Sequence, residues 1–121
     1  MRKIIQRTVF SVAFALATTA AYAHAQLVNA TPAVGATVAS ASEIRLKFSE
    51  GVEPQLSSIV LSHKDGAKIE TDPAGTEGKD KRFLALKLKK ALAPGGYTVR
   101  WEVVSIDSHK TQGSYSFEIK P

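Results

Sequence analysis

The sequence contains no cysteine and, beyond Met1, no methionine. Disulfide bonds are therefore excluded, and a folded domain must be held together by its hydrophobic core. The same absence removes thiolate and thioether groups, the sulfur ligands that soft metal ions prefer. Long apolar runs are also missing, because the run over residues 8–20 is shorter than the ~20 residues that span a membrane.

A clustered basic surface is missing as well. The formal net charge is +5, but three of the 16 Lys and Arg residues lie within the first seven positions. From residue 24 onward, the remaining 13 basic residues are nearly balanced by all 11 Asp and Glu residues. The densest basic group, Lys87, Lys89 and Lys90, is typical of the solvated face of a strand. Nucleic-acid binding requires a basic face with stacking aromatics, so no nucleic-acid partner is expected.

The first 23 residues have the three zones of a secretory signal peptide. A cationic head over residues 1–7 precedes the apolar run, and Ala21-Tyr22-Ala23 supplies an A-x-A cleavage signal. A transmembrane anchor is the alternative, but the run is short and no stop-transfer segment follows it. We therefore predict a cleaved signal peptide over residues 1–23 and one exported domain over residues 24–121.

The position of the cleaved bond stays open. Ala23-His24-Ala25 is a second A-x-A triplet, and cleavage after Ala25 would leave Gln26 as the first residue. This choice decides whether His24 carries a free amine.

Alternating apolar and polar residues predict several half-buried strands. The expected strands cover residues 43–48, 84–89, 97–103 and 115–120, with shorter candidates at 26–29, 58–63 and 68–71. Asp65-Gly66 predicts a turn, and Pro94-Gly95-Gly96 predicts a tight hairpin. We expect an all-β fold, an antiparallel β-sandwich or Greek-key barrel of about seven strands. Its core should contain the aromatic residues Phe48, Trp101, Tyr115 and Phe117.

The common signatures of catalysis are absent from the sequence. It has no glycine-rich phosphate loop, no nucleophile elbow and no evident hydrolytic pair of carboxylates. Three histidines remain, and one of them ends the triplet Asp107-Ser108-His109. In extended chain, residues i and i+2 project to the same side, so Asp107 and His109 can converge on one metal ion.

His24 strengthens the case for a metal site. If cleavage follows Ala23, His24 offers its α-amine and its imidazole, which form a chelate ring with one ion. With His109 this gives three nitrogen donors, and nitrogen-rich tetragonal sites select Cu(II). The alternative is that His24 merely lies near a processing site and that His109 belongs to a polar loop.

Four segments together closely resemble the CopC copper-resistance family. They are PGGYTVRWEVVSIDSH (residues 94–109), GSYSF (113–117), LKFSEGVE (46–53), and His24-Ala25 with the downstream PAVG (32–35). The resemblance spans the whole predicted domain. It implies a periplasmic β-sandwich of cupredoxin-like or Ig-like type that binds copper and passes it on.

The resemblance also implies a ligand set. Carried over by position, the Cu(II) ligands are His24 through amine and imidazole, Asp107 and His109. Glu50 matches an acid close to the site, as an outer ligand, as a hydrogen-bond acceptor for His24, or as an exposed carboxylate. The sequence departs from the family in lacking a methionine-rich Cu(I) site and in having Ser108 where glycine is usual. His63 is expected to be a solvent-exposed turn residue outside the site.

We therefore expect a monomeric copper-binding protein and not an enzyme. The resemblance further implies handover to a CopD-like inner-membrane partner. Two alternatives remain open at this point: a metal-free Ig-like interaction module, and a copper monooxygenase with a similar N-terminal histidine.

Overall fold

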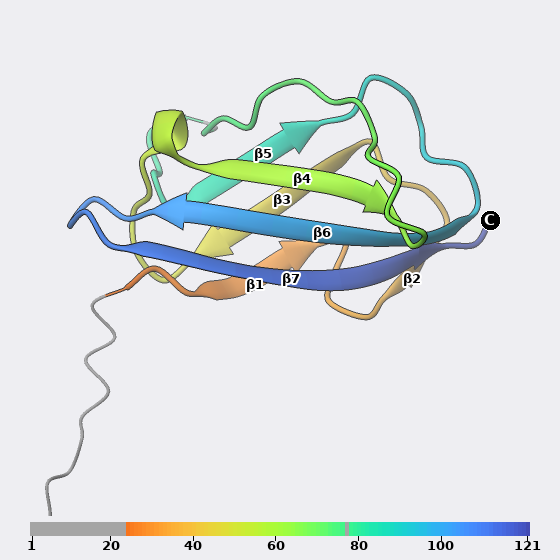
Figure 1. Ribbon diagram of the computed structural model, residues 1–121, viewed down its shortest axis with the longest axis horizontal. Helices are drawn as coiled ribbons and strands as arrows, with labels where there is room; N and C mark the ends of the chain where they lie inside the picture. Colours follow the sequence, from red (N-terminus) through yellow and green to blue (C-terminus); the bar gives the residue numbers. More distant parts are fainter. Residues whose placement is uncertain (1–23, 77) are drawn as a thin grey trace, which may run out of the picture.

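The computed structural model describes residues 24–76 and 78–121, so the predicted signal peptide lies outside the described residues. Seven strands and one 3-10 turn make up the fold (Figure 1). In chain order they are β1 (Leu27–Thr31), β2 (Thr37–Val38), β3 (Glu43–Phe48), η1 (Pro54–Leu56), β4 (Ser58–His63), β5 (Phe83–Lys87), β6 (Gly95–Val104) and β7 (Lys110–Ile119). No helix of the described residues is long and apolar enough to cross a membrane.

The strands form two sheets. One has the order β1-β3-β5 and the other the order β2-β7-β6-β4. All neighbouring strands are antiparallel except β2, which pairs in parallel with the end of β7. The predicted all-β sandwich of about seven strands is confirmed.

The core lies between the sheets and follows the predicted alternation. On β6, every second residue from Tyr97 to Val103 is buried, and the same holds on β7 from Tyr115 to Ile119. Phe48 of one sheet meets Trp101 of the other edge-to-face, with ring centroids 5.2 Å apart. Such a pair contributes about 0.5–1.5 kcal/mol beyond its buried area, and here it joins the two layers.

Two details of the predicted strands are wrong. Pro94-Gly95-Gly96 does not close a hairpin, because β5 and β6 belong to different sheets and residues 88–94 pass from one sheet to the other. Residues 68–71 do not form a strand. They make single bridges, Lys68 to Ser62 beside β4 and Thr71 to Leu88 beyond the end of β5, so this segment is divided between the two sheets.

The long β6–β7 hairpin determines where the candidate site lies. Its turn is at the same end of the sandwich as the start of β1 (Figure 1). The segment that follows β3 reaches this end too, because Val52 bridges to Ser105 and Gly51 O accepts a hydrogen bond from Ile106 N. Three stretches that are distant in the sequence therefore meet at one end of the molecule.

Candidate metal centre

The turn between β6 and β7 is a tight three-residue loop. Ser105 N donates to His109 O at 2.9 Å, and Ser108 N donates to Ser105 O at 2.9 Å. Ser108 has a φ of 72°, in the left-handed region. A three-residue hairpin loop whose last residue is left-handed is a common connection between antiparallel strands. The expectation of extended backbone at Asp107-Ser108-His109 is therefore wrong, and it is the turn that brings the two side chains together.

The N-terminal segment is held on the other side of the site by three hydrogen bonds. Gln26 N donates to Ser49 Oγ at 2.9 Å, and Ser49 N donates to Gln26 O at 2.8 Å. Thr111 Oγ1 donates to Ala25 O at 2.7 Å, and the Ala25 side chain is fully buried in the core. The backbone next to His24 is thus hydrogen-bonded both to the segment that follows β3 and to β7.

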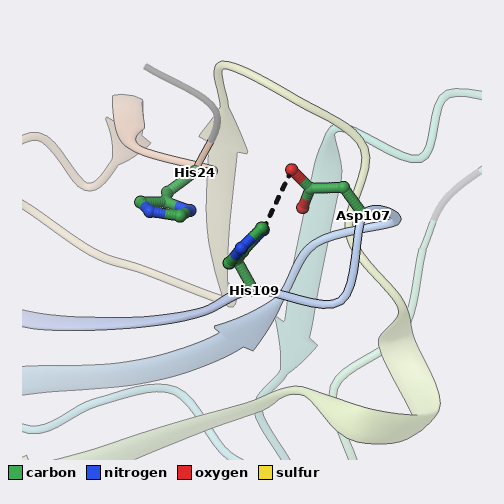
Figure 2. Close-up of side chains that lie close together, drawn as sticks. All are labelled: His24, Asp107 and His109. Atoms are coloured by element: carbon green, nitrogen blue, oxygen red, sulfur yellow. Dashed lines mark ion pairs between the residues drawn. The ribbon is translucent and has the colours of Figure 1, made fainter. Parts of the chain in front are cut away.

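These anchors bring His24, Asp107 and His109 together (Figure 2). One potential ligand atom from each side chain lies within 4.8 Å of the others. The two imidazole centroids are 4.3 Å apart, and His109 Nδ1 lies 3.1 Å from Asp107 Oδ2. All three side chains are exposed, so an ion can reach them from solvent. The described ranges contain one such group of three or more His, Asp or Glu side chains.

Hydrogen bonds to Asp107 keep its carboxylate ionised. The hydroxyl of Ser105 donates to Asp107 Oδ1, and this bond is the largest cause of a lowered pKa at Asp107. Desolvation opposes the shift, while the neighbouring His109 adds to it. A carboxylate that stays ionised is available as an anionic oxygen donor for a cation.

The two other polar residues singled out from the sequence lie outside this group. Glu50 is half-buried on the segment between Ser49 and Gly51, whose backbones bond to the N-terminal segment and to the turn respectively. Its chain position therefore borders the site, but its carboxylate is not part of the three-residue group. His63 is exposed at the end of β4, 5.2 Å from the ring of Tyr97, as expected.

Sequence reasoning missed the hydroxyl side chains that support the site. Ser105 follows Val103 in the inward-facing series of β6, so the alternation itself predicts that a polar side chain is buried there. Thr111 carries no comparable signal, because its role depends on the position of Ala25 across the fold.

The donor set suits a borderline divalent transition metal. Two imidazoles and one carboxylate are compatible with copper or zinc, and residues 24–121 include no Cys or Met. The residues present therefore fit a metal ion with nitrogen and oxygen coordination.

Comparison with known proteins assigns the family. The model of the CopC domain family matches residues 27–120, nearly the whole described region. The chain belongs to the CopC family. The expectation drawn from the sequence is confirmed at this level.

Relatives of this CopC-family chain align over most of their lengths. Protein YobA of Escherichia coli strain K12 is 42% identical over 106 residues, which cover 87% of this chain and 86% of the relative. Copper resistance protein C of Xanthomonas campestris pv. juglandis is 36% identical over 121 residues, covering 96% and 95%. The crystal structure of CopC from Methylosinus trichosporium OB3b superposes with a TM-score of 0.75 at 34% identity, covering 81% and 95%.

Proposed function

We propose that this CopC-family protein binds one Cu(II) ion through His24, Asp107 and His109 after removal of residues 1–23. The observation that carries the proposal is the convergence of these side chains, with potential ligand atoms within 4.8 Å, from two ends of the chain. Relatives named copper resistance protein C support a role in copper binding and resistance. The chain is accordingly a binding protein and not an enzyme.

The proposed fourth donor is the α-amine of His24. Cleavage after Ala23 turns the peptide nitrogen of His24 into an amine, and amine and imidazole then bind the ion as a chelate. We call this arrangement the histidine brace. Ala25 supports cleavage at this bond, because its side chain is fully buried and its carbonyl is bonded to Thr111. Cleavage after Ala25 would remove a residue that the fold packs into its core.

The donor set favours Cu(II) over other ions. Three nitrogens in a tetragonal arrangement suit Cu(II), which also has the highest affinity in the series of divalent first-row metals. The chain has no Cys and no Met beyond Met1, so it lacks the soft ligands of a Cu(I) site.

The exposed site fits transport and storage of copper in the periplasm. A monomer with an exposed ion can give it up to another protein on contact, and a CopD-like membrane protein is the proposed acceptor. Glu50 would act beside the ligands, as an outer ligand or as a hydrogen-bond acceptor for the His24 amine.

The test compares three forms of the domain that differ only at the N-terminus. One begins at His24, one retains Ala23 before it, and one begins at Gln26, each verified by intact mass. Cu(II) titration followed by electron paramagnetic resonance (EPR) measures the stoichiometry, the affinity and the number of coordinated nitrogens. We expect one tight site in the first form only. Equal affinity in the first two forms would rule out the amine as a ligand, and equal affinity in all three would rule out His24 altogether.

Exported protein from the periplasm identifies the natural form. N-terminal sequencing that begins at His24 agrees with the proposal. A start at Gln26 contradicts it, because His24 is then lost from the mature protein.

A further inference from the structure

Ser105 is a polar residue that is buried in the fold. It has no exposed surface, and among the described residues it is the one polar or charged side chain in the buried class. It lies directly after β6, at the inward position that follows Val103, where the preceding inward side chains are apolar. A hydroxyl at such a position is stable only with hydrogen-bond partners.

The partners of the Ser105 hydroxyl are the two ligand residues of the turn. It donates to Asp107 Oδ1 and accepts from His109 N at 3.3 Å. His109 O also lies 3.1 Å from this hydroxyl, but Ser105 N already donates to that carbonyl. A hydroxyl has one proton, and an ionised carboxylate is a stronger acceptor than a carbonyl that already accepts a hydrogen bond, so the proton is directed to the carboxylate.

We propose that Ser105 is a positioning residue of the copper site, fixing the Asp107 carboxylate and the His109 backbone from beneath the turn. The inference rests on the proposed copper-binding function and adds to it a residue that touches no ion itself. Outer-sphere hydrogen bonds of this kind hold ligands in place and typically change metal affinity by about 10- to 100-fold.

The backbone of the turn has other supports. Ser105 N bonds to His109 O, Ser108 N bonds to Ser105 O, and Ile106 N bonds to Gly51 O. The Ile106 side chain also packs against Gly51, where an added Cβ would lie 2.4 Å from Ile106 Cδ1. Loss of the Ser105 hydroxyl should therefore leave the turn folded and release mainly the orientation of the ligand side chain.

Ser105→Ala tests this role, with Ser57→Ala as the matched control. The Ser57 hydroxyl donates to Glu53 O and accepts from Val104 N, so it also supports the end of β6 but contacts no ligand residue. Ser105→Thr keeps the hydroxyl. Each variant is prepared with His24 as the first residue and is measured by Cu(II) competition titration, EPR and, without metal, the NMR signals of the His109 amide and ring.

We expect Ser105→Ala to bind Cu(II) about 10- to 100-fold more weakly, with altered EPR parameters and shifted His109 signals in the metal-free protein. Ser57→Ala should lose thermal stability but keep the affinity and the spectrum, and Ser105→Thr should remain close to the parent. Parent-like affinity and spectrum in a folded Ser105→Ala would overturn the proposal. So would a loss of affinity in Ser57→Ala equal to that in Ser105→Ala, because it would indicate general loosening.

Two further outcomes, an unfolded Ser105→Ala variant and a parent protein that does not bind Cu(II), can be told apart. If Ser105→Ala does not fold, Ser105→Thr decides: retention of the parent affinity supports the role of the hydroxyl, and a folded variant with more than tenfold loss contradicts it. If the parent protein itself fails to bind Cu(II) through His24, the proposed function fails. In that case the metal-free His109 signals of Ser105→Ala still report whether Ser105 positions the turn residues.

Discussion

The Thr111 hydroxyl donates a 2.7 Å hydrogen bond to the carbonyl of Ala25, and this bond joins the strand that follows His109 to the residue that follows His24. The two histidines therefore sit on backbones that are tied directly to one another. Their ring centroids are 4.3 Å apart, so the two imidazoles lie close enough to reach one ion. Side chains that hydrogen bonds of the fold hold in place lose less entropy when they bind an ion.

Removing the hydrogen bond from Thr111 to Ala25 should lower the Cu(II) affinity more than it lowers the stability of the fold. Thr111→Val keeps the shape of the side chain but leaves the Ala25 carbonyl without this donor, which costs about 1 kcal/mol of stability. We expect Cu(II) affinity to fall about tenfold, because the N-terminal segment gains freedom. Thr111→Ser retains the hydroxyl and should restore the affinity. Equal affinity for Val and Ser variants would show that the tie does not position His24.

Replacing the histidine of the turn and replacing that of β4 should have very different effects on Cu(II) affinity. His109→Ala removes a proposed ligand and should cost more than the roughly 10- to 100-fold typical of an outer-sphere residue. His63→Ala removes an exposed imidazole that is not in the three-residue group, and it should leave the affinity unchanged.

Glu50→Gln should give an intermediate loss, because Glu50 borders the site without belonging to the group. Competition titration of the three variants provides the ranking. A ranking in which Glu50→Gln or His63→Ala costs as much as His109→Ala contradicts the proposed ligand set.

Copper affinity should fall steeply between pH 7 and pH 5. Imidazole and α-amine groups ordinarily titrate near 6.5 and 7.7–8.0, so falling pH adds protons that compete with the metal ion. The pKa of Asp107 is lowered, chiefly by the Ser105 hydroxyl, so this carboxylate stays ionised over the same interval and does not contribute to the loss. Affinities measured by competition at half-unit steps of pH check this. Affinity that is constant from pH 7 to pH 5 would exclude imidazole and amine as the main donors.

The period-two pattern was sufficient to predict the fold class, since it reflects which side of each strand is buried. The residues of β3, β6 and β7 follow it closely. It could not predict which strands share a sheet, because a strand facing the core looks alike in either layer. For this reason the sequence pattern led us to expect a hairpin at Pro94-Gly95-Gly96, where the chain in fact crosses between the sheets. Strand β2 has only two residues and is too short to give a periodic signal.

The proximity of the proposed ligand residues could be anticipated from chemistry and resemblance, whereas the hydrogen bonds that hold them could not. The combination of His24 with Asp107-Ser108-His109 is visible in the sequence, and the structure brings these side chains together. The hydrogen bonds from Thr111 to Ala25 and between Gln26 and Ser49 link residues distant in the chain. Such contacts depend on the register of the folded strands, which no local pattern encodes.

Ser108 should be replaceable by glycine with a gain in stability. Its φ of 72° lies in the left-handed region, which costs a residue with a Cβ about 1–2 kcal/mol. Glycine avoids this cost but loses more entropy on folding, so Ser108→Gly should raise the free energy of unfolding by about 0.5–1 kcal/mol. Ser114→Gly, at an exposed position within β7, should lower it by a similar amount. Urea denaturation of the metal-free variants measures both. Destabilisation by Ser108→Gly would mean that the serine side chain supports the turn.

Removing the hydroxyl groups of two buried tyrosines should change the free energy of unfolding in opposite directions. The hydroxyl of Tyr97 donates to the carbonyl of Ala93, whereas that of Tyr115 is buried with no hydrogen-bond partner among the described residues. Burial also raises the pKa of Tyr115, as expected for a phenol removed from solvent.

Tyr97→Phe should therefore lower the free energy of unfolding by about 1 kcal/mol, through loss of a hydrogen bond and an unpaired carbonyl. Tyr115→Phe removes a polar group that is buried without compensation, and it should raise that free energy by about 1 kcal/mol. Both changes leave the ring, and hence the packing of the core, in place. Urea denaturation at pH 7 measures the pair under identical conditions. A destabilised Tyr115→Phe would show that its hydroxyl is hydrogen-bonded in solution, because only a lost partner can reverse the sign.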